Sequence, residues 1–395
     1  MTSDPAGLHS VKDHNLALVL ATIAEATGRH PTLSRAKVAQ LTKLSKATVS
    51  ALVDDLIAAG MVAELAPEAG VRGRPANLLQ LNPDGGFGIG VEINVDYVHA
   101  TAVDLTGAVH AKSVARIDNR TATPKQALRR AVHAVQKVRR QLAPEARIGG
   151  AVLAVPGLVD ANGIVRTAPN LVRWSHVPAG ELLRQMLPDM AELDIRVDNE
   201  ANLAALAQLW YGGVPDLTNF ILVTGEIGIG AGIVVNGSLF GGASGFAGEL
   251  GHVIALPDGP PCHCGARGCL EQVAGQDAIL RGAGLDPSSA TVDQLVVALE
   301  SGSARATRAV RDAGTAIGRA LSGAANLLDV THFVLGGSYA HLGLWLAPAI
   351  EDQLHAQILT RDGVRPSVAA SSLGPDAAVR GAAGLVVHEM LRNPR

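Results

Sequence analysis

The first 60 residues contain three stretches in which hydrophobic positions repeat with helical spacing. The first runs from Asn15 to Ala26 and the second from Ser34 to Thr42, after a polar break. In the third, Ser45 is a predicted N-cap and Gly60 ends the helix. Its apolar residues follow the i, i+3, i+4, i+7, i+8 spacing of one buried helix face: Val49, Leu52, Val53, Leu56 and Ile57.

Two short strand-like runs follow these helices, from Met61 to Leu65 and from Asn77 to Leu81. The segment between them, Gly70 to Pro75, is rich in Gly and Arg and predicts a hairpin, or wing. Asn82 to Gly86 is the densest turn cluster in the chain, and we expect the first domain boundary there. Residues 1–82 are therefore predicted to form a winged helix-turn-helix.

Residues 83–395 alternate strand-like and helical runs, which is typical of an α/β fold. The predicted strands are Gly88 to Ile93, His99 to Asp104, Gly149 to Ala154, Asp194 to Val197, Phe220 to Thr224, Ile233 to Val235 and His332 to Leu335. The predicted helices are Pro124 to Leu142, Asn202 to Trp210, Ala304 to Leu327 and a closing helix, Ala377 to Leu391.

Length and composition limit the class of protein. A chain of 395 residues exceeds one compact core, and 48% hydrophobic with 17% charged residues excludes general disorder, so two or three globular domains are expected. The net charge of -3 and pI near 6.5 exclude a polyanion-binding surface over the whole molecule. Any nucleic-acid binding must therefore come from a local basic patch.

Targeting signals and cysteine positions bear on the compartment. Residues Met1 to His14 contain no apolar run typical of a signal sequence, and no later stretch approaches the roughly 20 apolar residues of a membrane span. All three cysteines lie between Cys262 and Cys269, which favours a metal site over disulfides. These features predict a cytoplasmic protein in a reducing compartment, with no membrane partner.

The basic patch is found in the helical part of the N-terminal region. From Arg29 to Ser50 there are five basic residues and no acidic one. A helix-turn-helix places the start of its later helix in the major groove, and a basic wing can lie in the minor groove. The predicted DNA-contacting residues are Arg35, Lys46, Ala47, Thr48 and Ser50, with Arg72 and Arg74 in the wing. The alternative is a small helical domain for protein contacts.

One histidine and the three cysteines have the spacing of a metal site. His252 precedes the motif C-x-C-x4-C formed by Cys262, Cys264 and Cys269, and one His with three Cys suffices for a closed tetrahedral zinc site. Such a zinc would be structural, because no coordination position stays open. His263 is a competing ligand, and three buried free cysteines are the alternative.

The chain resembles the ROK family, the group of repressors, open reading frames and sugar kinases. The resemblance spans nearly the whole chain, and its most specific motif runs from Gly248 to Glu271. Further matching segments are Val155-Pro156-Gly157, Ala168 to Leu171 with Trp174, and Val197 to Asn202. The family fold implies two actin-like or hexokinase-like lobes, with lobe one at about 83–200 plus the C-terminal helix and lobe two at about 201–376 with the zinc site.

A helix-turn-helix ahead of this fold is the arrangement of the family's repressors. The resemblance therefore implies a sugar-responsive transcriptional regulator, most simply a repressor of carbohydrate genes, that binds a double-stranded DNA operator as a homodimer or homotetramer. Its effector would be a sugar or sugar phosphate. By motif position, the sugar would be surrounded by Asn170, Asn199, Glu200, Glu249, His252 and Glu271. For Asn199 and Glu200 the alternative is an N-terminal cap on the helix that follows.

The family's kinases hold phosphates with two glycine-rich turns, and both are altered here. The residues at these positions are Glu92 to Asp96 and Glu226 to Gly230, which add carboxylates that would repel phosphate. Glu200 takes the position of the kinases' general base, an Asp. The resemblance therefore implies that the chain is not an enzyme. A sugar kinase carrying a DNA-binding head and a regulator controlled by a protein partner remain as alternatives.

Overall fold

A computed structural model describes residues 5–27, 33–65, 77–190, 192–214, 217–359 and 365–394. Arg72 and Arg74, the predicted wing residues, lie outside the described residues. Among the helices that are described, none combines the length and apolar character that a bilayer crossing requires.

The N-terminal region has the three helices and the strand pair expected of a winged helix-turn-helix. Its helices are α1 (Pro5–Ala26), α2 (Arg35–Thr42) and α3 (Lys46–Ala58). Its sheet has the order β1 (Leu33–Ser34), β3 (Leu78–Leu81), β2 (Val62–Leu65), and both pairings are antiparallel. The helix α1 begins ten residues before the predicted start at Asn15, and β1 was not predicted.

Local side-chain hydrogen bonds explain where α2 and α3 begin. The hydroxyl of Ser34 accepts from the backbone N–H of Lys37 at 3.3 Å, and that of Ser45 accepts from Thr48 at 3.1 Å. Lys43, between the two helices, has a left-handed φ of 58°, which turns the chain sharply. The predicted N-cap at Ser45 is confirmed.

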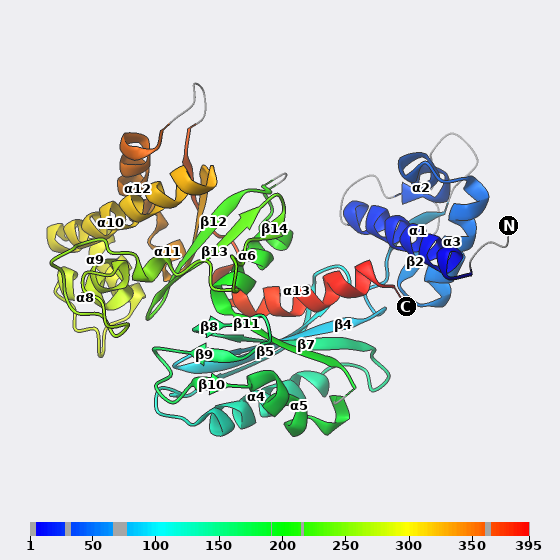
Figure 1. Cartoon of the computed structure of the whole chain (residues 1–395), viewed down its shortest axis with the longest axis horizontal. Helices are drawn as coiled ribbons and strands as arrows, with labels where there is room; N and C mark the ends of the chain where they lie inside the picture. The colour runs from blue at the N-terminus through cyan, green and yellow to red at the C-terminus, as the bar shows by residue number, and fades with distance from the viewer. Residues whose placement is uncertain are drawn as a thin grey trace.

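Two five-stranded sheets, each with helices packed against it, organise the rest of the described chain. The first has the order β11-β7-β4-β5-β6. Strands β11, β7 and β4 pair in parallel, whereas β5 pairs antiparallel with both of its neighbours, β4 and β6. Its strands are β4 (Phe87–Ile93), β5 (Tyr97–Asp104), β6 (Val109–Arg116), β7 (Ile148–Val155) and β11 (Asp194–Asn199). Helices α4 (Pro124–Arg139) and α5 (Ala179–Met186) cover one face, and we call this assembly the first lobe (Figure 1). A small sheet beside it contains β8 (Leu158–Val159), β9 (Val165–Thr167) and β10 (Ser175–Val177).

The second sheet, with its helices, makes the second lobe. Its order is β14-β13-β12-β15-β16, with strands β12 (Phe220–Gly225), β13 (Ile229–Val235), β14 (Ser238–Leu239), β15 (His332–Gly337) and β16 (Ser367–Ala370). Its helices are α6 (Glu200–Tyr211), α7 (Leu270–Ala274), α8 (Gln276–Ala283), α9 (Val292–Glu300), α10 (Ala304–Leu328), α11 (Ser338–His341) and α12 (Gly343–Gln357). Short 3-10 turns occupy Pro188–Met190, Leu250–His252 and Gly374–Asp376.

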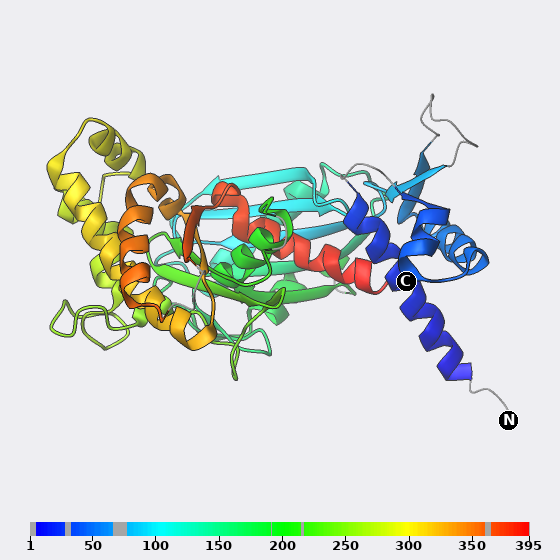
Figure 2. The same cartoon turned by 90° about the horizontal axis from the view of Figure 1, so that it is seen from above.

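The C-terminal helix α13 (Ala377–Arg392) connects the three parts of the molecule. It packs along α6 of the second lobe and against β4 and β7 of the first. Its C-terminal end reaches α1, and Figures 1 and 2 both show the C-terminus beside the N-terminal helices. Buried residues of the helix-turn-helix, α6 and α13 belong to one continuous hydrophobic cluster, so these parts share a core.

Candidate functional site

The predicted metal ligands meet in space. His252, Cys262, Cys264 and Cys269 each offer a ligand atom, and these atoms all lie within 4.8 Å of one another. Cys264 Sγ and Cys269 Sγ are 3.6 Å apart, and Cys262 Sγ is 3.8 Å from His252 Nδ1. Two sulfurs on one tetrahedral zinc, at about 2.3 Å each, are about 3.8 Å apart. The residues therefore fit a metal ion, whereas His263 is not part of the group.

The backbone around the cysteines is folded tightly. Cys262 N–H donates to the Ala266 carbonyl at 2.8 Å, and Gly268 has a left-handed φ of 70°. A Cβ atom on Gly268 would lie 1.5 Å from the Leu256 carbonyl oxygen, so this position requires glycine. These backbone constraints bring the three cysteines of the loop close together.

A cavity of about 610 Å³ lies next to the metal group, between the two lobes. All six residues that the sequence predicts to surround a sugar line it: Asn170, Asn199, Glu200, Glu249, His252 and Glu271. His252 connects the two features, because its Nδ1 faces Cys262 while its Nε2 lies 3.9 Å from Glu249 Oε2. A metal ion bound through Nδ1 would hold the ring, and so the wall of the cavity, in place.

Asn199 both caps a helix and lines the cavity. Its Oδ1 accepts from the backbone N–H groups of Ala201 at 2.8 Å and Asn202 at 3.3 Å, and its Nδ2 donates to the Gly157 carbonyl at 2.9 Å. These bonds fix the end of β11 and the start of α6. The capping alternative is therefore correct for Asn199, and it leaves the place of Asn199 in the cavity unchanged.

Glu200, the first residue of α6, lines the large cavity where it meets a small one of about 30 Å³, which we call the deep end, and its Oε2 atom is enclosed there. Burial raises the pKa of its carboxyl well above the usual value, and the nearby carboxyls of Glu226, Glu92 and Glu249 raise it further. Its Oε2 is buried without a hydrogen-bond partner among the described residues. The indole N–H of Trp174, another cavity residue, is also buried and unpaired. Such groups are available to hydrogen-bond a polar ligand.

Sequence reasoning did not name Asn94 and Tyr97 as part of this site. The amide of Asn94 donates to Glu226 Oε2 at 3.2 Å and to Glu92 Oε1 at 3.4 Å, and the Tyr97 hydroxyl donates to Glu92 Oε1 at 2.6 Å. The only signal in the sequence was the acidic residues of the two altered glycine-rich segments, Glu92, Asp96 and Glu226. Their meeting in space depends on the two sheets coming together.

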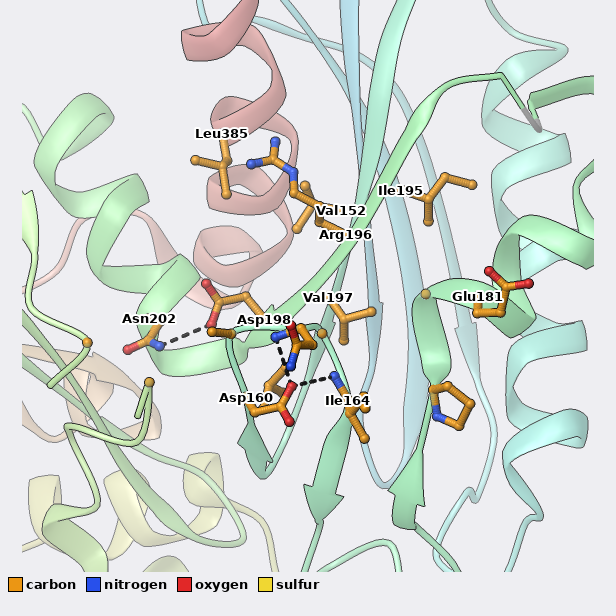
Figure 3. Close-up of a pocket in the computed structure, with 18 of the residues that line it drawn as sticks. Val152, Asp160, Ile164, Glu181, Ile195, Arg196, Val197, Asp198, Asn202 and Leu385 are labelled. Carbon is orange, nitrogen blue, oxygen red and sulfur yellow. Dashed lines mark hydrogen bonds between the residues drawn. The ribbon is translucent and has the colours of Figure 1, made fainter. Parts of the chain in front are cut away.

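A second cavity of about 510 Å³ lies near the first, around β11 (Figure 3). It is lined by residues of the first lobe, by Leu385 of α13 and by the segment after β14. Asp198 and Asn202 point toward each other in it, with Asn202 Nδ2 donating to Asp198 Oδ1 at 3.1 Å. Because Asp198 directly precedes Asn199 and Glu200, the two cavities have adjacent residues in their walls.

The predicted DNA-contacting residues of the helix-turn-helix fall into two groups. Lys46, Ala47 and Thr48 are exposed in the first turn of α3. Arg35, in contrast, is half-buried and already paired within the fold: its guanidinium contacts the Ser50 backbone and hydroxyl oxygens at 3.0 Å, Asp54 at 2.7 Å and Glu64 at 2.7 Å. In this structure Arg35 and Ser50 therefore join α2, α3 and β2.

Comparison with known proteins shows similarity over both parts of the chain. The model of the ROK family matches residues 88–389, and that of the MarR family matches residues 17–72. The xylose repressor of Caldicellulosiruptor bescii is 30% identical over 98% of this chain and 99% of its own length. The DNA-binding transcriptional dual regulator NagC of Escherichia coli is 29% identical over 96% of this chain and 94% of its own length.

Solved structures of ROK family proteins are similar to this chain in fold. A ROK family transcriptional regulator, homologous to the Escherichia coli MLC protein, superimposes with a TM-score of 0.77 at 26% identity, over 97% of both chains. A ROK family glucokinase from Streptomyces griseus, solved with glucose and AMPPNP, gives a TM-score of 0.65 at 26% identity, over 76% of this chain and 99% of its own. The winged helix-turn-helix and the kinase-like lobes together define a DNA-binding transcriptional regulator. The chain belongs to the ROK family.

Proposed function

We propose that this protein is a sugar-responsive repressor that binds a double-stranded DNA operator through α3 and its wing and a sugar in the cavity between its lobes. The observation that carries the proposal is that all six candidate sugar residues line one cavity of about 610 Å³, a size typical of small-molecule sites. Carboxylates and amides hydrogen-bond sugar hydroxyls well, and such a site rejects ligands that leave those groups unpaired.

The path from this cavity to the DNA-binding region runs through two helices. Glu200 is the first residue of α6, α6 packs along α13, and α13 contacts α1. A sugar that binds a more closed arrangement of the lobes would move α6 and α13 and, with them, the helix-turn-helix. Sugar binding shifts the equilibrium between the open and the closed arrangement of the lobes only if the sugar binds the two arrangements with unequal affinity.

DNA binding as a homodimer or homotetramer follows from the way operators are built. Two helix-turn-helix heads contact half-sites about one helical turn apart, so a change in the spacing of the heads changes DNA affinity. Lys46, Ala47 and Thr48 are the proposed groove contacts in this arrangement, with Arg72 and Arg74 in the minor groove. Arg35 and Ser50 would act close to the phosphates while supporting α3.

We infer that the metal group holds a structural zinc ion through His252, Cys262, Cys264 and Cys269. With four protein ligands no position is left for substrate or water, so the ion would stabilise the loop and the cavity wall. The bound ion supplies a fixed tetrahedral link between the η2 turn, Leu250–His252, and the cysteine loop.

A sugar kinase is the main competing function, since the fold resembles a glucokinase. The residues at the family's phosphate-binding positions argue against it, because Glu92 and Glu226 place carboxyl groups there, and both line one small cavity with Glu200. A kinase requires transfer of the γ-phosphoryl group from ATP to a sugar hydroxyl, and a coupled assay measures the ADP that this transfer releases. A regulator controlled by a protein partner requires that no sugar binds, which calorimetry measures.

The deciding experiment is a fluorescence-anisotropy titration of the protein against its own upstream DNA at fixed salt, with and without a panel of sugars. A sugar that shifts the midpoint supports the proposal. Tight DNA binding that no sugar changes contradicts the sugar-responsive part, and the absence of specific DNA binding contradicts the regulator itself.

A further inference from the structure

The cavity between the lobes is rich in carboxylates and poor in cations. Of the described residues that line it, none is a lysine or an arginine, and the ionisable groups besides its histidines and Cys264 are glutamates. These glutamates are Glu200, Glu226, Glu249 and Glu271. An anionic ligand would therefore meet carboxyl groups without a guanidinium or ammonium group to pair with.

The carboxyl groups gather most closely at the deep end. A small cavity of about 30 Å³ there shares Asn94, Glu200 and Glu226 with the large one and adds Glu92. Asn94 bridges Glu92 and Glu226 through its amide, and the Oε2 atoms of Glu92 and Glu200 are buried without a hydrogen-bond partner in the described part of the chain. As carboxylates these groups accept hydrogen bonds from a donor and repel a second anion.

The pKa values of Glu92 and Glu226 also reflect a region with many carboxyls and little positive charge. Burial raises the pKa of Glu92 to about 8, with the carboxyl of Glu226 as the second cause. Burial and, after it, the carboxylate of Asp96 raise the pKa of Glu226 to about 7. Arg116 lowers the pKa of Glu226, but it is the weakest influence on that group, and its side chain is 81% exposed and lies 3.8 Å from Asp96. These carboxyls therefore keep part of their protons at neutral pH, as expected of a region that lacks compensating positive charge, and a phosphate placed there would lack a cation in the same way.

The start of α6, which favours anions in principle, is already occupied. Asn199 accepts the N–H groups of Ala201 and Asn202, and the carboxyl of Glu200 lies in the first turn. A zinc ion with three thiolates and a neutral histidine would carry a net charge of about −1, so the proposed metal adds no anion-binding capacity. Lysine and arginine side chains, which commonly hold a phosphate, are therefore absent from the described cavity wall. The backbone N–H groups of Ala201 and Asn202 at the start of α6 are already hydrogen-bonded to Asn199.

We propose that the effector of this cavity is an uncharged sugar and that sugar phosphates and sugar acids are excluded. This inference rests on the proposed function and narrows its ligand class. A phosphate carries about −1.5 to −2 charges at neutral pH, and burying it beside carboxyls without a cation is strongly unfavourable. Neutral hydroxyls, in contrast, donate hydrogen bonds to the carboxylates that line the site.

The test is calorimetric and anisotropy titration of the full-length protein with D-xylose and with matched pairs: glucose and glucose 6-phosphate, N-acetylglucosamine and its 6-phosphate. Glucuronate adds charge with little bulk, and 6-O-methylglucose adds bulk without charge. The phosphorylated partner is expected to bind at least about 100-fold more weakly than its parent sugar, since one close charge pair in a partly desolvated site has an effect of this size. Glucuronate should be weakened similarly, and 6-O-methylglucose should be weakened much less.

Glu226→Gln tests whether charge is the cause. Glutamine keeps the side-chain length and an oxygen that accepts from Asn94. At pH 8, above the Glu226 pKa of about 7, the substitution removes a negative charge, so the affinity ratio between glucose and glucuronate measured there should narrow by roughly tenfold. Glu145→Gln, at an exposed position between α4 and β7, is the matched control and should leave the ratio unchanged. An unchanged ratio in Glu226→Gln, or equal weakening by 6-O-methylglucose, overturns the charge argument.

The outcomes also separate this inference from the proposed function. Tight binding of a sugar phosphate that shifts DNA affinity overturns the inference and leaves a sugar-responsive regulator standing. If neither neutral nor charged sugars bind, the proposed function itself fails, and the inference about its ligand class fails with it.

Discussion

The backbone of Gly381 in α13 lies so close to Leu203 in α6 that a Cβ atom on Gly381 would sit 1.8 Å from the Leu203 carbonyl oxygen. No side chain larger than hydrogen fits at this crossing. Because α6 begins at Glu200 in the cavity and α13 ends at the helix-turn-helix, this crossing lies on the proposed path between sugar and DNA.

Gly381→Ala should therefore force the two helices apart. We expect a loss of about 2–4 kcal/mol in unfolding free energy, as is usual for overpacking a close contact, and a weaker effect of sugar on DNA affinity. Gly323→Ala is the matched control: Gly323 is an exposed glycine in α10 where a Cβ would meet nothing within 4 Å, so alanine should stabilise by about 0.5–1 kcal/mol. Denaturant unfolding measures both, and equal effects of the two substitutions would contradict the close-contact argument.

His388 makes the same helix pair sensitive to pH. Its ring stacks on Trp210 of α6 at 3.9 Å, and burial, with a smaller effect of Arg392, lowers its pKa to about 4. Below pH 6.5 the unfolded chain binds a proton here and the folded chain does not. The contribution of neutral His388 to the unfolding free energy is therefore fully present above pH 6.5 and is lost as the pH falls towards 4. At pH 5 this loss amounts to about 2 kcal/mol.

His388→Phe keeps an aromatic ring against Trp210 and removes the titrating group. The difference in unfolding free energy between pH 7 and pH 5 should then shrink by about 2 kcal/mol relative to the unsubstituted chain. Denaturant titrations at the two pH values measure it. Parallel losses in both proteins would mean that other groups cause the acid sensitivity.

The parts of this fold that local interactions determine could be predicted from the sequence. The Ser45 cap and the apolar face of α3 depend on neighbours within a few residues, and the cysteine spacing specified the metal group before any contact was known. The strand β6 was missed because it is largely exposed and lacks an apolar pattern, and α12 was missed because it contains Pro348.

The deep end of the cavity could not be predicted in the same way. Asn94 and Glu226 are 132 positions apart and meet only because the two lobes come together. The sequence showed acidic residues in two altered glycine-rich segments, but not that one amide bridges two carboxyls. Likewise, Arg35 looked like a free basic residue, and only its contacts with Asp54 and Glu64 show its part in holding the fold.

Cys264→Ser should remove the metal and destabilise the second lobe. The purified protein should contain one zinc per chain, and the substitution should lower this content and the midpoint of thermal unfolding, since metal binding contributes directly to folding. His263→Ala, which changes the residue between two ligands but lies outside the ligand group, should keep its zinc. Metal analysis decides: a metal-free native protein would refute the zinc assignment.

Glu249→Ala should abolish the response to sugar and preserve operator binding. Glu249 lines the cavity beside His252, far along the chain from α3, so its loss removes hydrogen bonds to the ligand without touching the DNA-binding surface. The control is Asp258→Ala, at an exposed carboxylate outside the cavity wall. DNA titrations with and without sugar separate the outcomes, because loss of operator binding as well would indicate a folding defect.

Lys46→Ala should weaken DNA binding and make it less sensitive to salt. Lys46 is exposed at the first residue of α3, where a recognition helix meets the groove and its phosphates. If its ammonium group contacts one phosphate, its removal lowers the steepness of log affinity against log salt by about 1, for specific and random DNA alike.

The control is Lys125→Ala. Lys125 is an exposed lysine at the start of α4, so its substitution removes the same charge far from α3 along the chain and should leave the slope unchanged. Equal slopes for all three proteins would show that α3 does not meet DNA through Lys46. A changed slope in Lys125→Ala would instead place the DNA-binding surface on the first lobe, and the groove contacts proposed for α3 would then be wrong.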